Sequence, residues 1–223
     1  MLRVGLTGEL GSGKSTLAHM LAERGAVVLS SDEMARAMMQ PGDPVYTQIV
    51  ALFGSGVVQP DGSLDRKALA HLAFDPRHPR AEELNAIVHP AVIAEQAKQI
   101  ANLAKTQPHA IVVVESALIF STRYAPGGAW HKRFDCIVLV TAPDEVKVER
   151  FVRRMAQGRE LSPGELLALR ADAQRRLLVQ RIPMPESANV LEVQNSGDMD
   201  ALREQAQSLW KRLTVLEQAR PQA

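Results

Sequence analysis

The chain has 223 residues, a length that suits one domain with an insertion or two small lobes. Apolar residues make up 46% of the chain and aromatic residues only 4%, so the core must rest on aliphatic side chains. The 26 basic and 25 acidic residues give a net charge of +1, which argues against a general electrostatic surface for nucleic acids or membranes. No apolar run reaches the ~18–20 residues that span a bilayer, and we expect a cytoplasmic protein without a secretory signal.

The single cysteine, Cys136, rules out an intrachain disulfide and a cysteine-based zinc site. Cys136 lies in an apolar run, so we expect a small buried side chain at this position. The histidines show no metal-ligand spacing, and we expect no metal site built from protein side chains alone.

Short apolar runs alternate with amphipathic stretches along the chain, which predicts strands that are followed by helices. The expected strands are 4–7, 26–29, 111–114, 137–141 and 190–193, and the expected helices are 15–24, 31–39, 144–157 and 198–216. Because alternating strands and helices form βαβ units, we expect a three-layer α/β domain with a largely parallel sheet.

The alternation is interrupted between Gln40 and Pro108. Proline and glycine residues mark a break near position 42, and Asp61-Gly62 predicts the turn of a small hairpin that joins 57–58 to Leu64. The rest of this stretch predicts helices at about 46–52, 65–74 and 80–105. We therefore expect a nucleotide-binding core of residues 1–40 and 109–223, and an inserted helical substrate-binding lobe at 41–108.

Residues Gly8–Ser15 fit the pattern G-x-x-x-x-G-K-[ST] and stand between a predicted strand and a predicted helix. The glycines free backbone N–H groups to converge on an anion, and the helix N-terminus adds its dipole. Lys14 would reach the β- and γ-phosphates, Ser15 would bind Mg²⁺, and Thr16 would hold the α-phosphate. The residues expected to bind a nucleoside triphosphate here are Gly11, Ser12, Gly13, Lys14, Ser15 and Thr16.

Two acidic residues follow predicted strands. Since ligands of open α/β sheets bind beyond the carboxyl ends of strands, Asp32 could orient an attacking hydroxyl group, but it could equally cap the helix at 33–39. Glu115 ends the third apolar run. It could orient a water molecule on Mg²⁺, contact the phosphoryl acceptor, or pair with a nearby arginine.

An irregular stretch at about 155–163 separates two predicted helices and is a candidate lid. Ser162 and Pro163, with Glu165 three residues after the serine, predict the start of the second helix through a capping box.

Arginines gather just before and within this stretch. Arg150 and Arg154 are four residues apart and share one helix face, with Arg153 beside them and Arg159 in the candidate lid. Arginines can clamp the oxygens of a transferring phosphoryl group, and a lid that brings them to ATP also excludes water. The alternative is a solvated basic face that pairs with Glu145 and Glu149.

These motifs, taken in series, resemble those of the dephospho-CoA kinase family. The loop is shared by many kinases. The elements Asp-x-x-Ala-Arg (32–36), Leu-Asp-Arg (64–66) and His-Pro (89–90), which follow it in order, are much more specific. The resemblance extends over about residues 3–215 and rests on the loop at 5–16, Asp32–Arg36, 61–69, 84–90, Arg150 with Arg154, Arg170 with Gln174, and 188–197.

The resemblance implies a P-loop NTPase-type domain with a five-stranded parallel sheet, a helical substrate-binding insert and a short lid. It also implies transfer of a phosphoryl group from ATP, with Mg²⁺, to the ribose 3′-hydroxyl of dephospho-CoA. Asp32 would be the catalytic base, and Lys14 and Arg154 would stabilise the transferring group, with Arg150 as the second arginine. Candidate acceptor contacts are Asp32, Arg36, Arg66, His89 and Glu115.

The chain departs from the family pattern at Ser30, Ser121 and Asn189, where the pattern has acidic residues, and the stretch at 124–132 is longer. Two other functions therefore stay open: a different small-molecule or nucleoside kinase of the same fold, and a nucleotide-binding protein without catalytic activity. The sequence predicts no nucleic-acid or membrane partner and does not predict an oligomeric state.

Overall fold

The computed structural model describes residues 1–75, 77–121, 124, 130–179, 181–182 and 189–220. The contacts within the chain group it into two compact units. The first unit comprises residues 1–29, 104–121 and 130–223, and the second comprises 30–103 and 122–129, as far as these are described. This grouping starts the second unit at Ser30, while the proposed division into a core and a lobe at 41–108 stays a prediction.

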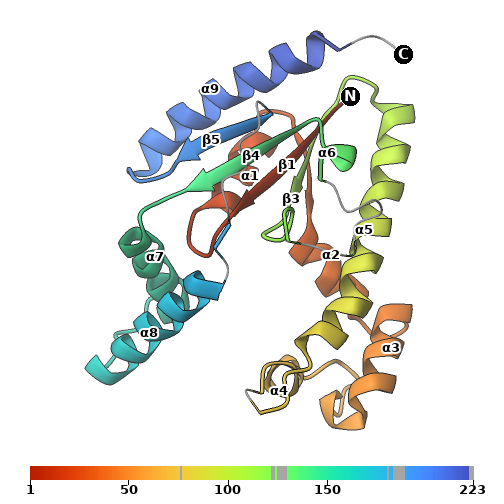
Figure 1. Cartoon of the computed structure of the whole chain (residues 1–223), viewed down its shortest axis with the longest axis vertical. Coiled ribbons are helices and arrows are strands. Elements are labelled where there is room, and N and C mark those ends of the chain that lie inside the picture. Colours follow the sequence, from red (N-terminus) through yellow and green to blue (C-terminus); the bar gives the residue numbers. More distant parts are fainter. Residues whose placement is uncertain (76, 122–123, 125–129, 180, 183–188, 221–223) are drawn as a thin grey trace. The chain divides into compact units, whose positions relative to one another are not determined.

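The first unit is built on a five-stranded sheet in the order β2-β3-β1-β4-β5, which confirms the expected α/β fold (Figure 1). The strands are β1 (Leu2–Gly8), β2 (Val27–Ser30), β3 (Ile111–Glu115), β4 (Cys136–Thr141) and β5 (Val190–Gln194). β1 pairs in parallel with β3 and β4, and β4 pairs in parallel with β5. The chain winds outward from β1 in both directions, so the carboxyl end of β1 lies at the switch point where open α/β sheets bind ligands.

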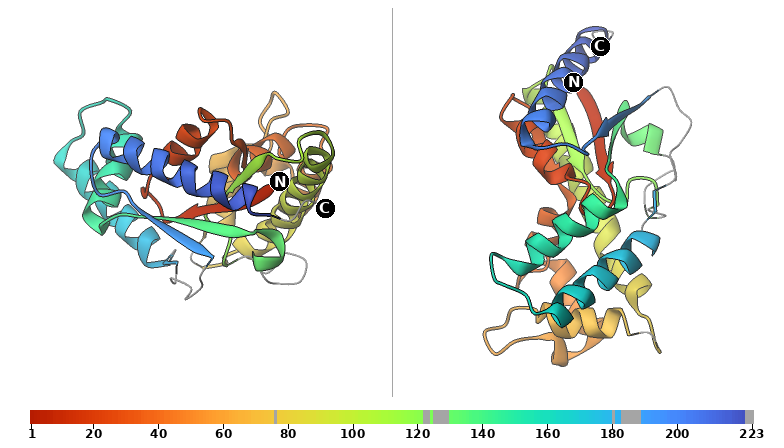
Figure 2. Two further views of the ribbon diagram at one scale, coloured as in Figure 1. Left: turned by 90° about the horizontal axis from the view of Figure 1, so that it is seen from above. Right: turned by 90° about the vertical axis from the view of Figure 1, so that its left-hand side faces the viewer.

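One face of this sheet packs against α1 (Lys14–Ala22) and α9 (Met199–Gln218), which lie on the same side in Figure 2. Because side chains alternate along a strand, every second residue of β1 and β4 enters this core. The buried strand residues on this face are Leu2, Val4, Leu6, Ile111, Val113, Cys136, Val138, Val140, Leu191 and Val193. The expected burial of Cys136 is confirmed, and burial and the adjacent Asp135 raise the pKa of its thiol to about 11.

The opposite face of the sheet is buried as well, as its near-continuous apolar strands require. Val112, Val114, Ile137 and Leu139 are at most 3% exposed. A β-carbon at Gly5 would lie 2.5 Å from Cδ1 of Ile137, so a larger residue at this position of β1 would displace that side chain. With both faces buried, functional side chains are left to the ends of the strands and to the helices.

Helices α7 (Asp144–Ala156) and α8 (Pro163–Val179) pack on each other, and we call the pair the α7–α8 arm. Val148 and Phe151 of α7 contact Ala173 and Leu177 of α8 in a small apolar cluster. The residue after α7, Gln157, has a left-handed φ of 50°, which ends the helix.

The predicted start of α8 is confirmed. The carboxylate of Glu165 accepts hydrogen bonds from the backbone N–H of Ser162 at 2.9 Å and from its hydroxyl at 2.7 Å. The N–H of Glu165 donates back to Oγ of Ser162 at 3.3 Å, which completes the capping box.

In the described residues of the second unit, the regular structure is helical apart from one bridge. It contains α2 (Ser31–Met38), α3 (Pro44–Phe53), the 3-10 turn η1 (Ser55–Val57), α4 (Arg66–Ala73) and most of α5 (Ala81–Thr106). Its core is formed by Val45, Ile49, Phe53, Val57, Leu64, Leu69, Val88 and Val92. The expected strands and the longer expected helices are confirmed to within two residues at each end.

The predicted hairpin is present as a single antiparallel bridge, Val58 with Leu64. Gly62 adopts a φ of 86° in the turn, and its carbonyl oxygen accepts a hydrogen bond from the Tyr46 hydroxyl at 2.6 Å. The sequence reading missed η1 and α6 (Trp130–Arg133), because one helical turn is too short to show an apolar period.

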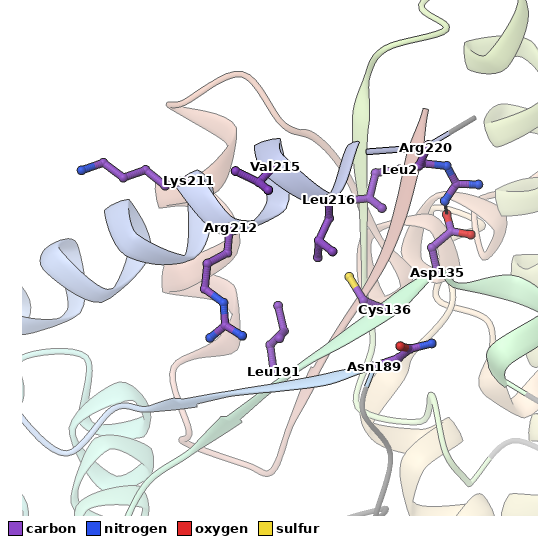
Figure 3. A pocket seen from close by; sticks show the side chains of 10 residues that line it. All are labelled: Leu2, Asp135, Cys136, Asn189, Leu191, Lys211, Arg212, Val215, Leu216 and Arg220. Carbon is purple, nitrogen blue, oxygen red and sulfur yellow. Dashed lines mark ion pairs between the residues drawn. The ribbon is translucent and has the colours of Figure 1, made fainter. Parts of the chain in front are cut away.

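A charged cluster stands at the amino ends of the strands, away from the phosphate loop. Asp135, directly before β4, accepts from the Arg3 guanidinium at 2.9 Å. It also accepts from the Arg220 guanidinium at 2.6 Å, as Figure 3 shows. The cluster borders an opening of about 570 Å³ beside α9. Its lining residues are Leu2, Asp135, Cys136, Asn189, Leu191, Lys211, Arg212, Val215, Leu216 and Arg220.

Within the described residues, no helix combines the length and the apolar character that crossing a membrane requires. The same residues bring together no group of three or more histidine, cysteine, aspartate and glutamate side chains that could hold a metal ion.

Candidate active site

The loop Gly8–Ser15 joins the end of β1 to the start of α1, as the motif predicts. Gly11 and Gly13 have φ values of 73° and 93°, which favour glycine. A β-carbon at Gly8 would lie 2.5 Å from Oγ of Ser12 and 2.6 Å from the carbonyl oxygen of Val140. The loop therefore needs glycine at all three positions to close tightly in front of α1.

The back of the loop is held by Asn195, the residue that follows β5. Its Nδ2 donates to the carbonyl oxygen of Ser12 at 2.8 Å, and its own N–H donates to the carbonyl oxygen of Thr141 at 2.7 Å. The side chain is 3% exposed, and a β-carbon at Gly13 would strike it. Asn195 thus fixes the loop to the sheet from behind.

Ser15 and Glu115 meet at the carboxyl ends of neighbouring strands. The parallel register pairs Leu6 of β1 with Glu115, and the Ser15 hydroxyl donates to Oε1 of Glu115 at 2.6 Å. Glu115 is 8% exposed and has no ion pair with an arginine in the described part of the chain, so that interpretation of Glu115 is not supported. A hydroxyl and a carboxylate at this distance are oxygen donors that suit Mg²⁺.

Lys14 and Thr16 occupy the first turn of α1 and are partly exposed. Among the described residues, no side-chain hydrogen bond or ion pair engages the ammonium group of Lys14. Its charge stands next to a helix N-terminus that is itself suited to anions.

The two arginines of α7 differ in their surroundings. Arg150 donates from Nη1 to the carbonyl oxygen of Asn195 at 3.0 Å and from Nη2 to Oδ1 of Asn195 at 3.2 Å. Burial, with a smaller contribution from the charge of Arg153, lowers the pKa of Arg150 from its ordinary value. Arg154 is exposed, and its guanidinium lies 5.7 Å from the centre of the Phe151 ring.

The alternative of a basic face paired with Glu145 and Glu149 is not supported, because the described residues show no such ion pair. Arg150 is bound to the loop from behind, whereas Arg154 and Arg159 stay exposed. Whether any of these arginines contacts a nucleotide stays a prediction.

In the second unit, Asp32 is the second residue of α2 and is exposed. The cap of α2 is Ser30, whose hydroxyl accepts from the N–H of Glu33 at 3.4 Å, so the capping interpretation of Asp32 is wrong. The neighbouring Ser31 hydroxyl accepts from Nε2 of Gln96 at 2.8 Å, which ties the start of α2 to α5. The exposed carboxylate of Asp32 therefore lies on a fixed first turn and does not cap α2.

The other predicted acceptor residues are spread over the second unit. Arg36 on α2 and Arg66 at the start of α4 are both exposed. His89 of α5 packs edge-on against Tyr124 at 5.7 Å between ring centres, and the Tyr124 hydroxyl donates to Oε2 of Glu82 at 3.2 Å. Burial lowers the pKa of His89, against a smaller opposing effect of the Glu82 charge.

Sequence reasoning gave no role to Glu9, Lys147 or Asn195, all of which contact or belong to the loop. Glu9 occupies an unconstrained position of the motif, and Lys147 looks like any surface lysine of an amphipathic helix. Asn195 was part of the Asn-x-Gly segment of the resemblance, which was the one available signal.

A parallel sheet whose first strand runs into a G-x-x-x-x-G-K-S loop places the chain in the class of P-loop NTPase-type proteins. The family model described as Dephospho-CoA kinase matches residues 2–184. A protein from Moorella thermoacetica named Dephospho-CoA kinase is 36% identical over 214 residues, which are 96% of this chain and 92% of its relative. The chain belongs to the dephospho-CoA kinase family, and it is a kinase.

Solved structures agree with the fold. A crystal structure from Thermus thermophilus superposes with a TM-score of 0.66 at 30% identity and covers 95% of this chain and 97% of its own. A dephospho-CoA kinase from Campylobacter jejuni gives a TM-score of 0.54 at 19% identity, covering 95% and 96% of the two chains, which shows the shared fold. The family model and the Moorella thermoacetica relative confirm the resemblance to dephospho-CoA kinases.

Proposed function

We propose that the chain transfers the γ-phosphoryl group of ATP to the ribose 3′-hydroxyl of dephospho-CoA and releases CoA and ADP, the last step of coenzyme A synthesis. The observation that carries this proposal is a closed phosphate loop with the Ser15–Glu115 pair at its edge, in a chain of this family. The loop supplies the donor site, and family membership supplies the acceptor.

The phosphates of ATP would lie in the loop against backbone N–H groups of Gly11 to Thr16. Lys14 is the charge that can follow the γ-phosphoryl group into the transition state, where charge spreads over its oxygens. Arg154 is exposed and could approach the same group from the α7–α8 arm. Arg150 would contribute from behind the loop, because its guanidinium is already bound to Asn195.

Mg²⁺ would be held by the Ser15 hydroxyl, with Glu115 directly behind it. A bound Mg²⁺ supplies neutralisation of the charge on the β- and γ-phosphates. Glu115 accepts the hydrogen bond of the Ser15 hydroxyl and keeps it in place. Glu115 is only 8% exposed, so its carboxylate is largely shielded from water.

Asp32 would orient the attacking hydroxyl. It follows β2 directly, at the strand end where open α/β sheets bind ligands, and it carries no capping role. The lobe at 41–108 would hold the rest of the acceptor, with Arg36 and Arg66 facing its pyrophosphate and His89 as a further contact. The lid at about 155–163 would exclude water. A cytoplasmic location and the absence of a nucleic-acid partner also stay predictions.

The test is an ADP-release assay with ATP, Mg²⁺ and dephospho-CoA. Asp32→Asn should lower turnover on the order of 10²-fold or more, the scale of lost acid–base positioning, while ATP still binds. Glu33→Gln, the exposed neighbour on α2, serves as the control and should retain turnover. Wild-type turnover in the Asp32→Asn variant would sink the role of Asp32, and no turnover of dephospho-CoA by the native chain would sink the proposed function.

A further inference from the structure

Glu9, the second residue of the phosphate loop, receives hydrogen bonds from the first turn of α7 and from Ile182, which follows α8 in the sequence. Lys147, in the first turn of α7, donates from Nζ to Oε2 of Glu9. The backbone N–H of Ile182, shortly after the end of α8, donates to Oε1 of Glu9 at 3.2 Å. One carboxylate of the loop therefore binds both the start of α7 and the segment that follows α8.

The Lys147 side chain is 6% exposed, which is unusual for a lysine. Burial alone would lower the pKa of Lys147, but hydrogen bonds with Asp144 and Glu9 outweigh it and raise the pKa above 10.5. Asp144 lies 2.7 Å from Nζ and is 60% exposed, so Glu9 is the more shielded of the two partners. Removing the partner of a buried charge is costly, because the charge is left uncompensated.

The loop also touches the arm at each of the next three residues. Leu10 packs against the apolar cluster of α7 and α8. A β-carbon at Gly11 would strike the carbonyl oxygen of Lys147, so the loop backbone lies directly on the first turn of α7. The carbonyl oxygen of Ser12 lies 3.5 Å from Nη1 of Arg150.

Lys147 and Arg150 are three residues apart and therefore lie on one face of α7. A contact that fixes Lys147 to the loop consequently also fixes the position of Arg150 along it. We propose that Glu9 is a positioning residue, which seats the α7–α8 arm on the phosphate loop and thereby holds the loop in its ATP-binding form. The inference rests on the proposed function for turnover, but ATP affinity tests it independently of any acceptor.

Glu9→Gln is the direct test, because it removes the charge and keeps an oxygen for the N–H of Ile182. Calorimetry should show ATP binding about tenfold weaker, within the range of coupled contacts. The KM for dephospho-CoA should stay within about twofold, since neither residue of the pair is among the proposed acceptor contacts. Asp144→Asn is the matched control: it removes the exposed partner of Lys147, does not touch the loop, and should leave ATP affinity within about twofold of the native value.

Lys147→Met, alone and combined with Glu9→Gln, completes a double-mutant cycle. If the pair acts as one device, the double variant should bind ATP no more weakly than either single variant. If Glu9→Gln binds ATP with native affinity, the pair is purely structural and the proposal is overturned, whether or not the melting temperature falls. Losses of ATP affinity that simply add in the double variant would overturn it as well. Glu9→Asp, which keeps the charge but shortens its reach, provides the same readout should Glu9→Gln not fold.

A native chain that binds ATP but leaves dephospho-CoA unphosphorylated would contradict the proposed function and still allow the affinity measurements. The two failures are therefore distinguishable.

Discussion

At the scale of single residues, the site depends on side chains whose partners come from other strands. Ser15 is placed by the loop motif, but its 2.6 Å hydrogen bond to Glu115 depends on the register of β1 with β3. Three interpretations of Glu115 were open from the sequence, and the contact with Ser15 favours the one that places this carboxylate beside Mg²⁺.

Glu115→Gln tests this role at constant shape. We expect the apparent Mg²⁺ affinity of the ATP complex to fall by about 10- to 100-fold, as for other residues that orient a metal ligand, with ATP binding in the absence of Mg²⁺ unchanged. Calorimetric titrations with and without Mg²⁺ separate the two effects. Glu192→Gln is a matched control, because the Glu192 carboxylate also accepts a hydrogen bond from a hydroxyl group, that of Thr141, at 2.7 Å. An unchanged Mg²⁺ titration in Glu115→Gln would contradict the assignment.

At the scale of elements, the α7–α8 arm combines a locally encoded part with a part that depends on the rest of the fold. The start of α8 is local, because Ser162 and Glu165 satisfy each other's backbone groups within four residues. The seating of α7 on the phosphate loop is not local, because Lys147 and Glu9 are separated by 138 positions. The sequence could therefore predict the helix start but not the attachment of the arm, and the lid stays a prediction.

Ser162→Ala should loosen the first turn of α8. Losing a serine cap costs about 1 kcal/mol, so amide exchange there should become about fivefold faster by a local opening. Hydrogen-exchange mass spectrometry of the 160–170 region measures this directly. Glu160→Ala, an exposed acid in the same stretch, is the control and should leave the exchange rate unchanged. Equal rates in the Ser162→Ala variant and the native chain would show that the capping box does not stabilise the helix.

At the scale of the whole molecule, the strands and long helices could be predicted because burial of whole strands leaves apolar runs in the sequence. The one-turn helix α6 could not, because it carries no period. The sequence could not predict that Asn195, Lys147 and Arg150 contact atoms of the loop, since their partners in the loop lie more than 130 positions away. Asp32 was placed at the start of α2, but only the structure shows that Ser30 has taken the capping role.

The Asp135 cluster ties the stability of the first unit to pH. Burial alone would raise the pKa of Asp135, but hydrogen bonds from Arg3 and Arg220 lower it from 3.8 to about 2. Because the folded pKa lies below the unfolded one, this carboxylate contributes stability above pH 3.8, and the contribution is lost as the pH falls toward about 2.

Thermal melts of the native chain and of Asp135→Asn across this range measure that contribution. The variant should melt at a lower temperature near neutral pH, and the difference should shrink as the pH falls through the window between the two pKa values. Asp172→Asn, which removes the acid that pairs with the exposed Arg175 and Arg176, is the control and should show a small difference at every pH. A difference between Asp135→Asn and the native chain that does not vary with pH would contradict the ion-pair account.

The backing of the phosphate loop also has a consequence for the order of events during synthesis. The loop ends at position 15, but the amide that fixes the carbonyl of Ser12 belongs to Asn195, 183 residues after Ser12. A nascent chain thus carries the complete loop sequence long before β5 and its following residue exist to hold it. Because contacts of such separation form late, the ability to bind nucleotide should appear only when folding of the first unit is nearly finished, and it would report on the completion of folding in a way that the motif alone does not.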